Sequence, residues 1–197
     1  MKLIVMTQPV LFTEEDRILT SLFEEGMESL HINKPDASPM FVERLLSLLP
    51  EDYYENIFIH NHFYLRNEYR LAGICLEDEN DSVPTGVKGK VTCICNNIKN
   101  LGDREIRKKY QYLILNNCFT DNGRTMKQLE DAATEGSINK KVYAMGRMNA
   151  DNVRLAAQMG FGGVVLYSDL WSRFDICKQD SYNGVLDYFA SIKKIIG

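Results

Sequence analysis

The chain has 197 residues, of which 45% are hydrophobic, and a formal net charge of −4. This length and apolar content suffice for one domain with a large core, and the absence of a basic stripe argues against nucleic acid as a partner. The apolar start of the chain is too short for a signal sequence or a membrane span, so we expect a cytoplasmic protein without a membrane partner. The five cysteines are odd in number, and we expect them to be reduced.

Eight short apolar runs predict buried strands, because each is brief and is bounded by turn-forming or polar residues. They cover residues 2–7, 29–32, 57–60, 73–76, 90–95, 112–115, 142–145 and 164–166.

The segments between these runs predict helices, because they carry apolar residues at helical spacing or end at glycine or proline. They cover residues 14–26, 38–49, 64–71, 98–110, 125–134 and 149–159, and a further helix starts at Ser168. Thr13 and Asn149 are the predicted N-caps of two of them. Residues 82–89, which contain Pro84, predict a loop.

This alternation of strands and helices predicts an α/β fold with parallel strands and right-handed crossovers. Eight units favour a (β/α)8 TIM barrel that occupies residues 1–197 as a single compact domain. An open, doubly wound sheet also alternates in this way, but its usual glycine-rich fingerprint does not follow the first strand.

The segment 141–171 carries glycines where phosphate is commonly held in such barrels. Gly146 follows the seventh run, and Gly162-Gly163 precede the eighth. Glycine lets a backbone approach an oxyanion closely, and free N–H groups at a helix start point at negative charge. Glycines also occur wherever helices meet strands, so the alternative is a purely structural role.

All three histidines fall at predicted strand ends, where a barrel places its chemistry. His31 belongs to the second strand, and His60 and His62 to the third. His60 and His62 would share one strand face, so the three could bind zinc; otherwise they are polar groups satisfied by their neighbours.

Two cations also lie at predicted strand ends, and both could bind phosphate groups. They are Lys34 and Arg147. Lys34 could instead be solvated ahead of Pro35, and Arg147 could pair with an acid such as Asp169.

The sequence resembles the thiamine phosphate synthase superfamily, which includes the thiazole tautomerases, over essentially the whole chain. The resemblance is strongest in AMGRMNADNVRLAAQMGFGGVVLYSDLW, and it extends to GMESLHINKPD and IFIHNHFYLRNEYRLAGICLED. It implies a (β/α)8 barrel that joins an aminopyrimidine methyl diphosphate to a thiazole phosphate and releases pyrophosphate, with Mg²⁺ as cofactor.

The resemblance also implies roles for individual residues. The catalytic set is His31, His60 and Lys34. Substrate would be contacted by Asn33, Asn61, His62, Cys93, Asn116 and Asn117, and phosphate by Gly146, Arg147, Gly162, Gly163 and Ser168. The magnesium ligands would be Asn61 and Asp78.

Several of these positions depart from the family pattern. Asn33 stands where the family has an arginine, Asn61 where it has a magnesium-binding aspartate, and Arg147 where it has a glycine. Loss of an anionic ligand would weaken a magnesium site.

Three hypotheses follow. The first is a thiamine phosphate synthase that acts with Mg²⁺ supported by Asn61, Asp78 and Glu77. The second is a tautomerase-like enzyme in which a histidine moves the proton. The third is a catalytically silent relative that binds a phosphorylated ligand or a protein partner. The expected partners are phosphorylated small molecules, and a homo-oligomer remains open.

Overall fold

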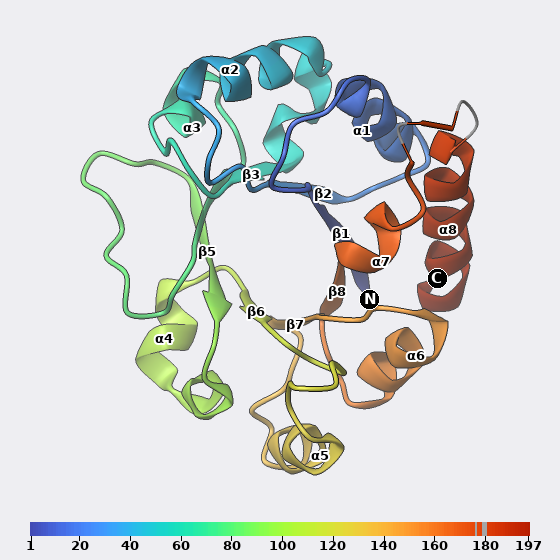
Figure 1. The fold of residues 1–197 in the computed structure, drawn as a ribbon. Helices are drawn as coiled ribbons and strands as arrows, with labels where there is room; N and C mark the ends of the chain where they lie inside the picture. The colour runs from blue at the N-terminus through green and yellow to red at the C-terminus, as the bar shows by residue number, and fades with distance from the viewer. Residues whose placement is uncertain (176, 179–180) are drawn as a thin grey trace.

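The computed structural model describes residues 1–175, 177–178 and 181–197, and its centre is a closed barrel of eight parallel strands. Each strand pairs with its neighbours in the sequence, and β1 pairs with β8 to close the ring (Figure 1). The predicted (β/α)8 fold is therefore confirmed. The strands are β1 (Lys2–Met6), β2 (Ser29–Ile32), β3 (Ile57–Ile59), β4 (Gly73–Leu76), β5 (Lys90–Cys95), β6 (Leu113–Leu115), β7 (Val142–Met145) and β8 (Gly163–Leu166).

Most of the helices surround this ring on the outside (Figure 1). The helices are α1 (Glu15–Glu24), α2 (Pro39–Leu48), α3 (Leu65–Glu68), α4 (Arg104–Lys109), α5 (Met126–Thr134), α6 (Ala150–Gln158), α7 (Ser168–Trp171) and α8 (Ser181–Ile196), with 3-10 helices η1 (Glu51–Asn56) and η2 (Ile98–Gly102). The described residues 77–89, between β4 and β5, contain no helix, in agreement with the predicted loop. None of the described helices is long and apolar enough to cross a membrane.

Alternation along the strands divides the apolar residues into two cores, because successive side chains point to opposite faces of a strand. One core fills the barrel and the other lies between the strands and the helices. The barrel interior contains Ile4, Met6, Phe58, Cys75, Ile94, Tyr112, Ile114, Tyr143, Met145 and Val165.

Two local predictions were wrong. Helix α1 is preceded by Glu14 in a left-handed backbone (φ 71°), so Thr13 is not its N-cap. The helix predicted over residues 98–110 is broken into η2 and α4 because the Asp103 carboxylate accepts the N–H groups of Glu105 and Ile106 and starts a new helix. The N-cap at Asn149 is confirmed, since its side chain accepts the N–H of Asn152.

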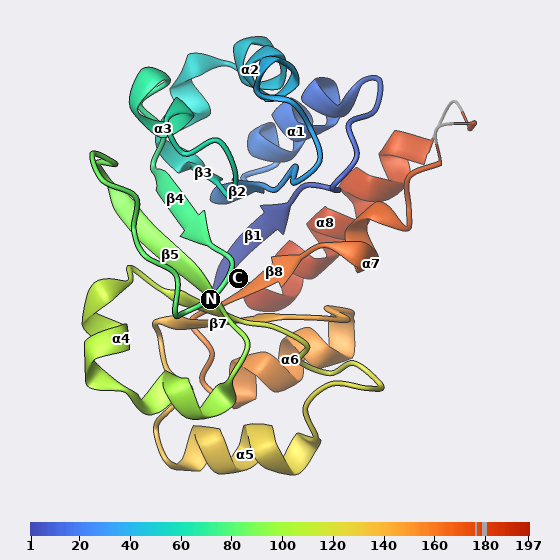
Figure 2. The same ribbon diagram turned by 60° about the vertical axis from the view of Figure 1, so that its left-hand side comes forward.

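The last strand leads directly into α7, which lies beside α8 (Figures 1 and 2). Helix α8 also packs against α1 and α6 and so joins the two ends of the chain. Trp171, at the end of α7, donates its indole N–H to the carbonyl oxygen of Met6 at 2.7 Å. This contact fixes α7 over the carboxyl end of β1, at the mouth of the barrel.

Candidate functional site

A cavity of about 370 Å³ opens at the carboxyl ends of the strands, which form the mouth of the barrel. Barrel enzymes place their chemistry at this end. Six of the residues predicted for the site line this mouth cavity: Asn33, Asn116, Asn117, Gly146, Arg147 and Ser168. An adjoining cavity of about 420 Å³ shares five lining residues with it and extends the space toward Asp121.

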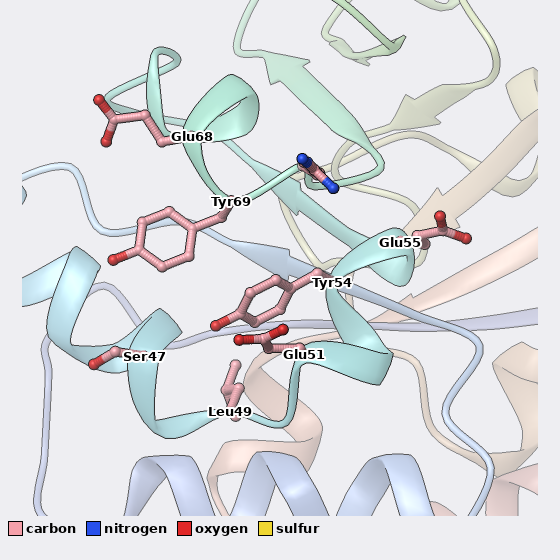
Figure 3. Close-up of a pocket in the computed structure, with 8 residues that line it drawn as sticks. Ser47, Leu49, Glu51, Tyr54, Glu55, Glu68 and Tyr69 are labelled. Atoms are coloured by element: carbon pink, nitrogen blue, oxygen red, sulfur yellow. The ribbon is translucent and has the colours of Figure 1, made fainter.

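A larger cavity of about 560 Å³ lies on the opposite side of the barrel, between the end of α2, η1 and the end of α3 (Figure 3). Glu51, Glu55 and Glu68 line it, with Arg70 as a lining cation. These elements precede β3 and β4 rather than follow them, so this cavity lies away from the carboxyl ends of the strands. The mouth cavity is therefore the candidate site.

Four side chains form a hydrogen-bonded chain from the barrel interior to the mouth cavity. The Tyr112 hydroxyl lies 2.6 Å from His31 Nε2, His31 Nδ1 lies 2.8 Å from His60 Nε2, and His60 Nδ1 lies 2.6 Å from Glu77 Oε1. His31 and His60 are buried, whereas the Glu77 side chain is 48% exposed and lines the cavity. The chain therefore links the barrel interior to the surface of the site.

The directions of these hydrogen bonds follow from the two ends of the chain. A carboxylate only accepts, so His60 Nδ1–H donates to Glu77, and with neutral rings His31 Nδ1–H donates to His60. Burial, and then the neighbouring His60, hold the pKa of His31 well below its usual value. Burial raises the pKa of Tyr112 well above its usual value, so its hydroxyl stays protonated and donates to His31.

The loop after β7 carries the cation of the mouth. Gly146 has a φ of 118°, and a Cβ there would lie 2.5 Å from the carbonyl oxygen of Cys118, so only glycine fits without a shift. The next residue, Arg147, makes two hydrogen bonds to the Asp121 carboxylate, at 2.7 and 2.6 Å. The side chains of this pair are 50% and 75% exposed, so it is an open ion pair at the rim.

The backbone N–H group of Met148, the residue after Arg147, donates a hydrogen bond to a carboxylate. Asp169, the second residue of α7, accepts the N–H of Met148 at 2.8 Å. The arginine thus pairs with Asp121 rather than with the predicted Asp169. Asp169 also lines the mouth cavity and adds a negative charge beside Arg147.

Comparison with known proteins decides the family. A crystal structure of thiamine phosphate pyrophosphorylase from Bacteroides thetaiotaomicron is 40% identical, with a TM-score of 0.90, and the match covers 100% of this chain and 98% of that one. This chain belongs to the thiamine phosphate pyrophosphorylase family.

More distant solved structures share the fold alone. The thiamine phosphate pyrophosphorylase from Pyrococcus furiosus is 17% identical with a TM-score of 0.74, over 100% of this chain and 97% of that one. A 3-hexulose-6-phosphate synthase is 13% identical with a TM-score of 0.63, over 98% of this chain and 100% of that one. Neither the protein-family models nor the curated proteins gave a match.

Lys34, predicted from the pyrophosphorylase pattern to act in catalysis, points away from the mouth. Its ammonium group lies 2.6 and 2.9 Å from the two Glu15 oxygens and 3.1 Å from the Val10 carbonyl oxygen. Both side chains are 1% exposed. Burial lowers the pKa of Lys34 and raises the pKa of Glu15 to about 7, while the attraction between them opposes both shifts. The structure therefore gives Lys34 a structural partner instead of a substrate.

The predicted magnesium ligands do not meet. Asn61 Oδ1 accepts the backbone N–H of Lys34 at 3.0 Å, and Asp78 Oδ1 accepts both N–H groups of Asn80 within its own loop. These hydrogen bonds lower the pKa of Asp78. Neither residue lines the mouth cavity, and one carboxylate with one neutral amide is a poor donor set for Mg²⁺. The residues present therefore do not fit the family's metal at these positions.

Four further expectations need correction. Gly162 and Gly163 lie at the amino end of β8, opposite the mouth, because the strand begins at Gly163 itself. Cys93 is buried in the core between strands and helices. His62 has a left-handed backbone (φ 51°), and its Nε2 contacts the Ala37 carbonyl oxygen at 2.9 Å. It therefore joins neither a zinc site with the other histidines nor the mouth cavity.

Of the hydrogen-bonded chain, Tyr112 was not assigned to the site from the sequence, and Glu77 was expected only to support magnesium. Tyr112 stands just before β6, and alternation with Ile114 places it on the interior face. Glu77 directly follows β4, the position at which barrel side chains reach the mouth. Both signals were present in the strand pattern.

Proposed function

We propose that the protein synthesises thiamine phosphate by joining an aminopyrimidine methyl diphosphate to a thiazole phosphate. In this reaction the bond between the methylene carbon and the diphosphate oxygen breaks, the thiazole nitrogen bonds to that carbon, and pyrophosphate leaves. The observation that carries the proposal is the 40% identity, over whole chains, to a protein named thiamine phosphate pyrophosphorylase. The mouth cavity supports it, because its amides and its arginine suit phosphorylated heterocycles.

In this proposal Arg147 receives a phosphate group. Its partner Asp121 is mostly exposed, and exposed ion pairs add little stability, so a phosphate can take the place of the carboxylate. The amides of Asn33, Asn116 and Asn117 then donate to ring nitrogens and phosphate oxygens. Departure of pyrophosphate is not assigned to magnesium, because the ligands for it are not assembled.

The direct test is incubation of the purified protein with both substrates, with and without added Mg²⁺, followed by chromatographic detection of thiamine phosphate. We expect product, and less of it from Arg147→Ala. The absence of thiamine phosphate under all conditions would refute the proposal. Calorimetric titration with thiazole phosphate would then show whether the cavity still binds a phosphorylated ligand.

A second candidate is metal-independent proton transfer on a phosphorylated thiazole, and the Glu77–His60 contact favours it. Glu77 is the carboxylate of the hydrogen-bonded chain, and it reaches the cavity. It would take a proton from one ring atom and return it to another, while His60 Nδ1–H holds its other oxygen in place. Isomerisation of a thiazole phosphate that persists unchanged in Glu77→Gln would exclude this role.

A further inference from the structure

A second cluster of ligand-type atoms lies inside the barrel, beneath the mouth cavity. His31 Nδ1, His60 Nε2 and Cys75 Sγ all lie within 4.8 Å of one another. They come from β2, the residue that follows β3, and β4, which are neighbouring strands of the ring. All three side chains are buried.

We propose that His31, His60 and Cys75 bind one thiophilic divalent metal ion, zinc, in the barrel interior. Zinc takes both imidazole nitrogens and thiolates as ligands, and three protein ligands leave its fourth position free. This proposal concerns atoms below the mouth cavity and does not depend on the reaction carried out there.

The outer hydrogen bonds of the two histidines support this assignment. His60 Nδ1 contacts the Glu77 carboxylate and His31 Nε2 contacts the Tyr112 hydroxyl, both at 2.6 Å. Metal-binding histidines usually have such an oxygen partner on the second nitrogen, which sets the ring orientation. The nitrogen that remains on each ring faces the other histidine, and Cys75 Sγ lies beside both.

The three ligand atoms must shift to share one ion. They lie within 4.8 Å of one another, whereas tetrahedral zinc bonds of about 2.0–2.3 Å would place the sulfur about 3.5 Å from each nitrogen, so the Cys75 side chain moves inward by up to about an ångström. The two inner nitrogens are 2.8 Å apart, whereas a tetrahedral zinc ion with bonds of about 2.0–2.1 Å would hold them about 3.3 Å apart. A shift of about half an ångström replaces the hydrogen bond between the rings with two metal bonds.

The protons and charges also balance. His31 moves its proton from Nδ1 to Nε2 and donates it to the Tyr112 oxygen, whose own hydroxyl hydrogen rotates away from the ring. The Cys75 thiol releases its proton to solvent. Zinc with one thiolate carries one net positive charge, which the nearby Glu77 carboxylate offsets.

The test is the metal content of the full-length protein after expression in zinc-supplemented medium and gel filtration. We expect about one zinc ion per chain in the wild type, and none in Cys75→Ser. Two matched controls should keep the metal: Cys118→Ser, which changes another buried cysteine, and His62→Gln, which changes the histidine outside the cluster.

Cobalt substitution gives a second measurement that needs no variant. Protein expressed with Co²⁺ should show a thiolate-to-cobalt charge-transfer band and the intense visible bands of tetrahedral coordination. Wild-type protein without zinc, a cobalt spectrum without the thiolate band, or a Cys75→Ser variant that retains wild-type zinc would each overturn the proposal. Since these readouts do not involve turnover, their failure is distinct from a failure to form thiamine phosphate.

Discussion

The buried pair of Glu15 and Lys34 makes the sharpest prediction about stability. Glu15 is in the first turn of α1, and Lys34 follows β2, so the pair fastens a helix to the loop beside the barrel mouth. Each side chain is 1% exposed, and the nitrogen lies 2.6 and 2.9 Å from the two carboxylate oxygens. Replacement of either partner alone leaves the other charge buried without its counterion.

Loss of one partner from a buried ion pair costs about 3–5 kcal/mol of unfolding free energy. In a chain of this size each kcal/mol corresponds to about 2–4 °C, so Lys34→Met should lower Tm by about 6–20 °C at pH 8. The double variant Glu15→Leu/Lys34→Met removes both charges and should cost less than the sum of the single changes, because neither charge is then stranded.

The destabilisation by Lys34→Met should depend on pH. The pKa of Glu15 rises from 4.5 to about 7 in the folded protein, with burial as the largest cause and Lys34 opposing it. Between these values the folded chain binds a proton that the unfolded chain has lost, so this contribution to stability is lost as pH rises through 7. Without Lys34 the pKa of Glu15 rises further, so the variant is destabilised more at pH 8 than at pH 5.

Chemical denaturation at pH 5 and pH 8 would measure these differences in all four members of the cycle. Lys108→Met is the control, since it breaks an ion pair whose two side chains are 72% and 81% exposed, and it should leave the unfolding free energy unchanged. The reasoning is refuted if Lys34→Met costs less than about 1 kcal/mol, or if the double variant loses the full sum of the single losses.

Three further predictions concern the barrel and its mouth. Gly146→Ala forces a Cβ to 2.5 Å from a backbone oxygen and should cost about 1–3 kcal/mol by denaturation, more than Gly136→Ala, where a Cβ meets open space. Asp121→Asn frees Arg147, so calorimetry should show tighter binding of thiazole phosphate, whereas Arg147→Ala should weaken it roughly tenfold. Unchanged affinity in both would exclude the arginine from the phosphate site. Tyr112→Phe leaves a buried ring nitrogen without its donor and should lower the unfolding free energy by about 1–3 kcal/mol.

Strand positions could be predicted from the sequence because burial on both faces leaves an unbroken apolar run. Each predicted run overlaps its strand, and the amides Asn33, Asn116 and Asn117, which the family resemblance implied for the site, line the mouth cavity. The Gly162-Gly163 pair was wrongly given a phosphate-binding role, because residues that precede a strand lie at its amino end, away from the mouth. Here Gly163 already pairs with Lys2 in the sheet.

Side-chain direction was harder to predict than strand position. His60 and His62 would share a face only if β3 continued, but the strand ends at Ile59 and His62 adopts a positive φ, so the two side chains separate. Lys34 was expected at the mouth because it follows a strand. The contrary signal was Glu15, which precedes Ile18, Leu19 and Leu22 by three, four and seven positions and therefore lies on the apolar face of α1.

The barrel has two sets of hydrogen-bonded buried polar side chains, and only one of them reaches the mouth cavity. Glu15 and Lys34 satisfy each other out of contact with solvent, so their removal as a pair should change stability and leave the mouth cavity intact. The chain of Tyr112, His31 and His60 ends at Glu77, which is exposed to the cavity. Buried polar side chains rarely stabilise a core more than well-packed apolar ones would. These hydrogen-bonded side chains place two imidazoles in the barrel interior and reach the site. This arrangement therefore favours a role in proton transfer or metal binding over a purely structural role.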